Sequence, residues 1–173
     1  MEEYLHDMKI TQEYASINRR TIGEIILKEM KWNRKVVEQF TTIHNYIDLD
    51  NMILRKGAIS AQLGEKVIIP MNMRDGSLIA VGKGNEDWNY SAPHGAGRLM
   101  SRSEASQRIS LSEFKKSMEG IYSTSVVRET IDESPMAYKP MQEIIDNTKD
   151  TIDIQSIIRP IYNYKAHEEI KRK

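Results

Sequence analysis

The residues best suited to chemistry lie in a glycine-rich segment, residues 91–98, which reads Ser-Ala-Pro-His-Gly-Ala-Gly-Arg. Small residues after His94 let a ligand approach the backbone closely, and consecutive N–H groups in such a loop can cradle an anion. Arg98 adds a fork of donors that suits phosphate. Since a neutral imidazole nitrogen can attack phosphorus, the segment predicts His94 as a nucleophile. The alternative is a turn histidine held by its own loop.

A second histidine, His44, is followed directly by Asn45 at the end of an expected strand. An imidazole can bind a divalent metal, and the neighbouring amide can contact another ligand or a phosphate. One histidine does not make a metal site. A hydrogen-bonded structural role for His44 is therefore the alternative.

Composition limits the class of protein. Lys+Arg and Asp+Glu each total 25, giving zero net charge, and cysteine is absent, which argues against a disulfide-stapled secreted scaffold. No apolar run approaches the roughly 20 residues of a membrane-spanning helix, and the acidic start lacks the pattern of a signal peptide. The 173-residue length suits one domain with a hydrophobic core. We therefore expect a cytoplasmic protein with no membrane partner.

A small excess of cations lies in the glycine-rich middle of the chain, residues 51–110. It indicates either a solvated mixed surface or a phosphate-handling site. Two common nucleotide-binding patterns do not account for it. Asp87 stands where the third glycine would follow Gly82 and Gly84 in a dinucleotide fingerprint, and no Gly-Lys-Ser/Thr ending marks a P-loop.

We expect one α+β unit with an N-terminal helix, a mixed β-sheet containing a hairpin, C-terminal helices and a final strand. Apolar residues recur at helical spacing through the first thirty residues, although a capping-box pattern at Thr21 would allow a break there. Strands are expected at 52–54, 67–69 and 78–81. The Asp75-Gly76 pair predicts a hairpin turn between the last two.

The second half of the chain is expected to be mainly helical. A polar loop over 82–98 is followed by helix after Met100. Ser110 and Glu113 form a capping-box pattern, with Gly120 as a helix stop. A further helix is expected after Pro140 and a final strand over 157–164.

Several short motifs occur in order along the chain. They are Tyr14-Ala15-x-x-Asn18-Arg19, His44-Asn45, Arg55-Lys56-Gly57-Ala58, Ile69-Pro70-x-x-Met73 with Ser77, the 91–98 segment, Met100-Ser101-Arg102 and Ala137-Tyr138-Lys139. Together they resemble the RtcB-type RNA-splicing ligases, which join RNA ends bearing a 3′-phosphate or 2′,3′-cyclic phosphate to a 5′-hydroxyl. The resemblance covers nearly the whole chain, 1–173, and corresponds to the C-terminal portion of a family chain.

The resemblance implies a role for each matching residue. His94 would take GMP from GTP as a histidine phosphoramidate, and His44 would bind one manganese ion, with Asn45 near the nucleotide. The family's pocket strand usually reads Pro-Gly-Ser-Met, so Met71 is larger than the usual residue, whereas Asn72 can still hydrogen-bond. The guanylate pocket would be lined by Pro70, Met71, Asn72, Met73, Ser77, Gly95, Ala96, Gly97 and Lys165.

The same resemblance implies two Mn²⁺ ions, GTP as co-substrate, and RNA ends of the kinds named above as partners. The family's other metal ligands, including a Cys, an Asp and further His residues, would precede Met1. His44 alone cannot hold a two-metal centre, so we expect this chain to bind GTP poorly and not to ligate without the missing N-terminal part. The alternatives are a non-catalytic RNA-binding or assembly module, and an unrelated phosphate-binding enzyme that shares the loop.

Overall fold

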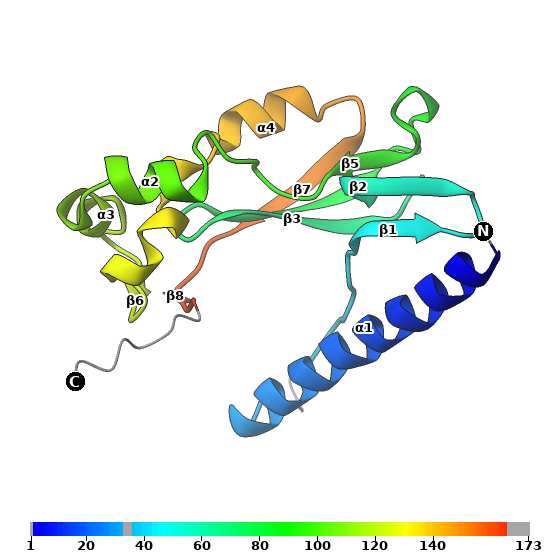
Figure 1. Ribbon diagram of the computed structural model, residues 1–173, viewed down its shortest axis with the longest axis horizontal. Coiled ribbons are helices and arrows are strands. Elements are labelled where there is room, and N and C mark those ends of the chain that lie inside the picture. The colour runs from blue at the N-terminus through cyan, green and yellow to red at the C-terminus, as the bar shows by residue number, and fades with distance from the viewer. Residues whose placement is uncertain (1, 33–35, 166–173) are drawn as a thin grey trace.

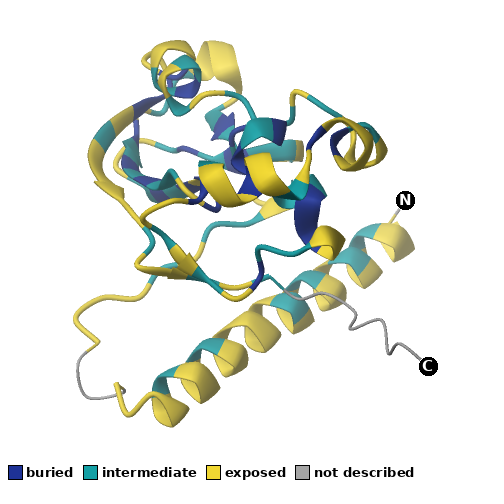
Figure 2. Ribbon diagram, turned by 90° about the vertical axis from the view of Figure 1, so that its left-hand side faces the viewer, coloured by how far each residue is buried: buried dark blue, intermediate teal, exposed yellow. Residues whose placement is uncertain are grey.

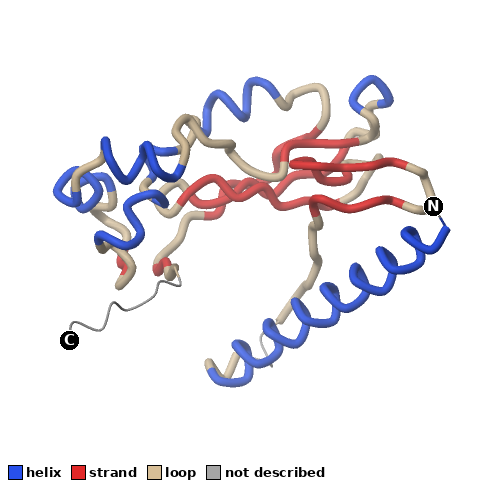
Figure 3. The backbone as a smooth tube through the Cα atoms, in the orientation of Figure 1, coloured by secondary structure: helices blue, strands red, loops and turns tan. Residues whose placement is uncertain are grey.

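The computed structural model describes residues 2–32 and 36–165 and has the expected α+β class. Its strands form two three-stranded antiparallel sheets, and the parallel pairing in the described part of the chain joins two very short strands. The strands lie at the centre, with a long helix along one side (Figure 3). The short helices lie mainly toward one end of the molecule. None of the helices in the described ranges could cross a membrane.

The N-terminal helix is the longest element, and it is separate from the core. Helix α1 (Glu2–Glu29) runs for 28 residues without interruption, so the predicted helix is confirmed and the break near Thr21 does not occur. Apolar residues do follow its helical period, but no residue of α1 is buried. Figure 1 shows α1 beside β1, outside the group of sheets and short helices. One face of α1 approaches β1, where Gln12 and Arg19 line a cavity with His44.

The first sheet has the order β1-β2-β5, formed by β1 (His44–Asp48), β2 (Ile53–Ser60) and β5 (Ser91–Pro93). Arg55 in β2 is 2% exposed, and its guanidinium donates to the Tyr46 hydroxyl at 2.9 Å, to Asp48 at 3.0 Å and to the Ser91 hydroxyl at 2.9 Å. One buried cation thus ties all three strands together. The strand expected at 52–54 begins at Ile53 and is longer than predicted.

The second sheet has the order β3-β4-β7, formed by β3 (Lys66–Asn72), β4 (Gly76–Gly82) and β7 (Ile152–Ile158). The predicted β3–β4 hairpin is confirmed. Its turn is closed by the Asn72 side-chain oxygen, which accepts from the backbone N–H groups of Arg74 and Asp75 at 3.0 and 2.9 Å. Gly76 has φ +88°, a conformation that glycine adopts without steric cost.

The expected loop at 82–98 contains two short elements that the sequence did not reveal. A 3₁₀ turn, η2 (Glu86–Trp88), begins at Asn85, whose side chain accepts from the Asp87 N–H, and strand β5 follows it. β5 has three residues, which is too short for a period to be visible. It forms because Ala92 pairs with Ile59 at the edge of β2.

The chain after β5 consists mainly of short elements. The Ser110–Glu113 capping box is present at α3, and a helix follows Pro140 as predicted. Three helices, two 3₁₀ turns and two short strands make up this region: α2 (Arg102–Arg108), α3 (Leu111–Ser117), β6 (Tyr122–Ser123), η3 (Arg128–Glu133), η4 (Pro135–Ala137), α4 (Met141–Asn147) and β8 (Tyr162–Asn163).

The final strand is not placed as predicted. We expected one strand over 157–164, whereas β7 ends at Ile158 and β8 covers Tyr162–Asn163. Arg159 and Pro160 lie between them, and proline has no N–H to continue a ladder. β7 starts earlier because it pairs with β4 from Ile152 onward.

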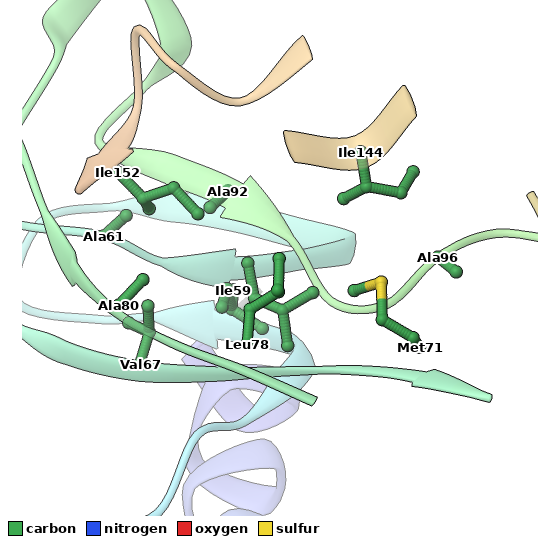
Figure 4. Close-up of a cluster of buried hydrophobic side chains, with 11 residues drawn as sticks. Ile59, Ala61, Val67, Met71, Leu78, Ala80, Ala92, Ala96, Ile144 and Ile152 are labelled. Atoms are coloured by element: carbon green, nitrogen blue, oxygen red, sulfur yellow. The ribbon is translucent and has the colours of Figure 1, made fainter. Parts of the chain in front are cut away.

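Two hydrophobic clusters hold the sheets and short helices together. The larger combines alternate residues of β3 and β4 with β2, β5, β7 and α4, and Figure 4 shows Ile144 of α4 above Leu78 of β4, with Met71 and Ala96 at one end. The second cluster gathers around Phe114, which is fully buried. Met71 belongs to the first cluster and Met73 to the second, so the end of β3 connects the two.

Candidate functional site

The structure brings the two predicted histidines together. The imidazole rings of His44 and His94 stack with centroids 4.7 Å apart and planes 11° from parallel. His44 begins β1 and His94 follows β5, and both strands pair with β2, which lies between them. His44 is paired with Ile59, and Ile59 is paired in turn with Ala92, two residues before His94. The sheet register therefore creates a pair of rings from positions fifty residues apart in sequence.

Gly57 in β2 fixes the orientation of this pair. Its carbonyl oxygen lies 2.6 Å from Nδ1 of His94, and its N–H donates to the Asn45 side-chain oxygen at 2.6 Å. Because a carbonyl oxygen can only accept, Nδ1 carries the hydrogen, and Nε2 of the neutral ring keeps its lone pair. His94 is exposed, and the geometry therefore allows, but does not test, the predicted use of this lone pair as a nucleophile. Gly57 has φ +66°, and a side chain at this position would be strained.

The surroundings of the second ring favour its neutral form. Burial lowers the pKa of His44 below its usual value of 6.5, and the charges of His94 and of Arg19 from α1 lower it further. A neutral imidazole has the lone pair that a metal ion needs. Asn45 lies beside it with φ +55°, a left-handed conformation that asparagine tolerates better than most residues. The Asn45 side-chain oxygen is engaged by Gly57, and the predicted contacts of His44 with metal and of Asn45 with a nucleotide remain predictions.

The glycine-rich loop after His94 packs onto β3. The Ala96 N–H donates to the Pro70 carbonyl at 3.2 Å, so this amide is engaged within the protein. A Cβ at Gly95 would come within 3.1 Å of the same oxygen, which explains why a residue without a side chain suits this position. Gly97 has φ +72° and its carbonyl accepts from the Lys139 N–H. The loop thus joins the imidazole pair to the end of the β3–β4 hairpin.

A cavity of about 280 Å³ opens beside that hairpin end. Six of the residues predicted to bind nucleotide line it: Pro70, Met71, Asn72, Met73, Ser77 and Lys165. Asn45, His94 and residues 95–97 do not line it, and instead make up the neighbouring imidazole site. Seven further lining residues had no predicted role in binding: Gly76, Glu133, Tyr138, Ile158, Arg159, Pro160 and Asn163.

The predicted strand residues contribute to this cavity in unequal ways. Met71 and Met73 are 3% and 1% exposed and belong to the hydrophobic clusters, so they form part of its wall. The Asn72 side chain closes the hairpin turn and also donates to Asp75 at 2.8 Å. Its hydrogen-bonding groups are therefore engaged inside the turn.

Glu133 holds two other residues of the cavity, Tyr138 and Lys165, in place. Its carboxylate accepts from the Tyr138 hydroxyl at 2.9 Å and from Arg102 at 2.8 Å, and lies 3.2 Å from the Lys165 ammonium. Burial by itself would raise the pKa of Glu133, but Tyr138, Lys165 and Arg102 together lower it further than burial raises it. Burial and the neighbouring carboxylate raise the pKa of Tyr138 to about 12. Lys165 is thus held at the cavity by an ionised partner.

Arg98 is not placed as an anion ligand. Its guanidinium donates to the Tyr138 hydroxyl at 2.9 Å, to the Met100 carbonyl at 3.1 Å and to the Asp132 carbonyl. It also lies over the Tyr138 ring, 4.8 Å from the centroid. The predicted phosphate contact by Arg98 is therefore replaced by a structural role, in which it fixes Tyr138 against the cavity.

Comparison with known proteins identifies the family. Residues 1–166 match the family described as "tRNA-splicing ligase RtcB". The RNA-splicing ligase RtcB of Escherichia coli is 31% identical over 95% of this chain and 44% of its own length. The tRNA-splicing ligases RtcB of Aeropyrum pernix and Archaeoglobus fulgidus are 39% and 35% identical over 83% and 84% of the chain, and 37% of their own lengths. The chain belongs to the RtcB family.

The chain spans less than half the length of these RtcB relatives. Within residues 2–32 and 36–165, no group of three or more His, Cys, Asp or Glu side chains could hold a metal ion. His44 offers one neutral imidazole, and a metal centre needs several ligands with the right geometry. The described residues therefore do not fit a complete manganese site by themselves.

Sequence reasoning found the RtcB motifs but gave no role to several cavity residues. Tyr138 was part of the Ala-Tyr-Lys motif, and Asn163 lies two residues before Lys165, so proximity to these motifs was the available signal. Glu133 carried no such signal. Its position follows from η3, which ends at Glu133 and brings the carboxylate to Tyr138 and Lys165.

Proposed function

We propose that this chain is the guanylate-accepting part of a cytoplasmic RtcB-type RNA ligase. The complete enzyme would join a 3′-phosphate or 2′,3′-cyclic phosphate RNA end to a 5′-hydroxyl end, using GTP. The observation that carries the proposal is the hydrogen bond between Nδ1 of His94 and the Gly57 carbonyl, which leaves Nε2 as an exposed nucleophile. Membership of the RtcB family supplies the substrate class.

The proposed reaction begins when the Nε2 lone pair of His94 attacks the α-phosphorus of GTP. A P–N bond forms, the bond from the α-phosphorus to the oxygen bridging the β-phosphate breaks, and pyrophosphate leaves. A 2′,3′-cyclic phosphate end would first be hydrolysed, in that water adds to phosphorus and the bond to the 2′-oxygen breaks, which leaves a 3′-phosphate and a 2′-hydroxyl. An oxygen of the RNA 3′-phosphate then displaces His94 from phosphorus and takes GMP. The 5′-hydroxyl finally attacks the activated 3′-phosphate, loses its proton and releases GMP.

The cavity beside β3 would hold the guanosine end of the nucleotide during this reaction. It is lined by Ser77 and Lys165, as proposed for the guanylate pocket, and the loop of residues 95–97 connects it to His94 through Pro70. Its volume of about 280 Å³ is near the lower end of the range typical of small-molecule sites. Binding and chemistry would therefore occur in adjacent places on one face of the protein.

Two manganese ions are proposed for the complete enzyme, with His44 as one ligand. When bound, they would neutralise charge that develops on the transferred phosphoryl group. The remaining ligands would come from outside this chain. For this reason we propose that these residues alone bind GTP weakly and do not ligate RNA.

Exposed apolar side chains on α1 support the need for a second part. Seven of them are 48–70% exposed: Tyr4, Ile10, Tyr14, Ile17, Ile22, Ile25 and Ile26. Helix α1 also reaches the imidazole pair, because Arg19 and Gln12 line a cavity of about 190 Å³ together with His44 and Asn45. A protein surface that covered α1 would therefore lie against the catalytic histidines. We propose that the remaining part of an RtcB ligase occupies this position.

A non-catalytic RNA-binding or assembly module is the second candidate. The exposed apolar surface of α1 is compatible with it, because a partner protein could cover that surface without any chemistry at His94. It differs from the first proposal in predicting no covalent GMP under any condition.

Labelling with GTP separates the two candidates. The chain would be incubated with Mn²⁺ and GTP labelled in the α-phosphate, alone and together with the part of the Escherichia coli ligase that lies outside the match. The first proposal predicts an acid-labile label when both parts are present, which is lost in His94→Ala and kept in His6→Ala, an exposed histidine on α1. No label with both parts present would overturn the ligase proposal and favour the module.

A further inference from the structure

One hydrogen-bonding atom at the cavity has no role within the fold. The side-chain oxygen of Asn163, Oδ1, is buried and has no hydrogen-bond partner among the residues that the structure describes. Asn163 itself lines the cavity together with Lys165. Buried acceptors are almost always satisfied, so an unsatisfied one beside a cavity indicates a donor that arrives with a ligand or with water.

The backbone around Asn163 is firmly positioned. Asn163 belongs to β8 and pairs with Ser123 of β6. Two residues later, the Lys165 N–H donates to the Ser125 hydroxyl at 2.8 Å, and that hydroxyl donates to the Lys165 carbonyl at 3.1 Å. Ser125 is fully buried. The segment that carries Asn163 and Lys165 is thus fixed at both ends.

The other acceptor on this wall is already engaged. The Glu133 carboxylate accepts hydrogen bonds from Tyr138 and Arg102 and forms an ion pair with Lys165. It therefore has little remaining capacity to accept a hydrogen bond from a ligand. Among the described residues that line the cavity, Asn163 Oδ1 is the buried side-chain atom without a hydrogen-bond partner, and the Lys165 ammonium, paired with Glu133, is a neighbouring donor. Asn163 and Lys165 both line the cavity and lie two residues apart. Because Oδ1 is buried, the Asn163 amide would turn toward the cavity to accept from a ligand.

That pair matches the edge of one purine. Guanine carries an exocyclic 2-amino donor and the acceptors O6 and N7, whereas adenine has a 6-amino donor in place of O6. A site with an acceptor for the 2-amino group and a cation for O6 or N7 would therefore favour guanine. Hypoxanthine shares the acceptors of guanine but lacks the 2-amino group, and so isolates the contribution of that single donor.

We propose that Asn163 selects guanine by accepting a hydrogen bond from its 2-amino group. The inference rests on the proposed function, since it requires the cavity to take the base of a guanine nucleotide. Asn163 acts on base specificity and takes no part in phosphoryl transfer at His94.

Binding of GTP and ITP to the 173-residue chain tests this inference, with chemical shifts as the readout so that millimolar affinities are measurable. One neutral hydrogen bond corresponds to roughly a 3- to 10-fold preference for GTP over ITP in the wild type. Asn163→Leu should remove this preference by weakening GTP and leaving ITP nearly unchanged. Asn163→Asp, which keeps an acceptor oxygen, should retain it. Asn147→Leu, an exposed asparagine at the end of α4, is the matched control and should behave as wild type.

The outcomes separate this inference from the proposed function. If GTP and ITP bind the wild type equally, or if Asn163→Leu weakens both by the same factor, the selecting role of Asn163 is wrong while guanylate binding stands. If neither nucleotide shifts any cavity resonance, the proposed function fails and the inference fails with it. Near-ultraviolet circular dichroism of each variant confirms that the comparison is between folded proteins.

Discussion

Apolar side chains are largely exposed on helix α1 but largely buried in the β3–β4 hairpin. In the hairpin, Leu78 and Ile69 are fully buried, whereas Ile25 and Ile26 on α1 are more than half exposed. Figure 2 shows the contrast directly, with α1 mostly exposed and the buried residues gathered among the sheets and short helices. The two regions thus differ in whether the structure contains the surface that their apolar faces require.

The difference teaches that helix formation and helix burial are separate events. The hydrogen bonds within α1 join residues four positions apart, so the helix contains its own backbone partners. Burial of its apolar face requires a partner surface, and most helical stability in proteins comes from such packing. We infer that α1 is the less stable of the two regions when this chain is alone.

The largest expected effect comes from truncating equivalent apolar side chains in the two regions. Leu78→Ala should lower the free energy of unfolding by roughly 3–5 kcal/mol, because it leaves a cavity at a fully buried position. Ile25→Ala, at a position 54% exposed, should change it by less than about 0.5 kcal/mol. Urea denaturation measures both. Equal losses would contradict the contrast between the regions.

A glycine-to-alanine pair should give effects of opposite sign. At Gly76 a Cβ would lie 1.9 Å from the Ile158 carbonyl oxygen and φ is +88°, so Gly76→Ala should destabilise by roughly 2–4 kcal/mol. At Gly23 in α1 nothing lies within 4 Å of a Cβ, and alanine favours helix by about 0.5–1 kcal/mol. Thermal unfolding of both variants checks the signs. A loss of stability in Gly23→Ala would show that this face of α1 is already covered.

The smallest expected effect concerns pH. The lowered pKa of Glu133 stabilises the fold at pH values above its ordinary 4.5, and this contribution is lost as the pH falls through the folded-state pKa. Glu133→Gln should therefore flatten the decline in stability below about pH 4.5. Urea midpoints measured across the acid range test this, with Glu13→Gln on exposed α1 as the control. An unchanged acid limb in Glu133→Gln would show that its ion pairs do not stabilise the fold.

Local signals predicted the elements that depend on neighbouring residues. The helical period gave α1, the Asp75-Gly76 pair gave the hairpin turn, and Ser110 gave a capping box. Each of these depends on contacts within a few residues. The final strand was misplaced because its ends depend on pairing with β4, about seventy residues away, and β5 was missed for a similar reason.

The candidate site also combines features that local sequence predicted with features that depend on long-range packing. The glycine-rich segment identified His94 and its family, but it did not reveal that the ring of His44 stacks on it or that Gly57 orients its Nδ1. Arg98 suggested a phosphate ligand by its type, and packing instead directs it to Tyr138. The type of a residue defines which interactions its side chain can make, and its neighbours in the folded protein determine which of these it does make.

The sequence by itself determined the α+β class and the RtcB resemblance, and it singled out His94 as the proposed nucleophile, because short motifs and local periods contain that information. The tertiary structure alone decided that β2 brings His44 and His94 together and that Glu133 pairs with Lys165 at the cavity. It also decided that Oδ1 of Asn163 is buried without a hydrogen-bond partner among the described residues. These features arise from strand register and long-range packing, which join residues that the sequence keeps far apart.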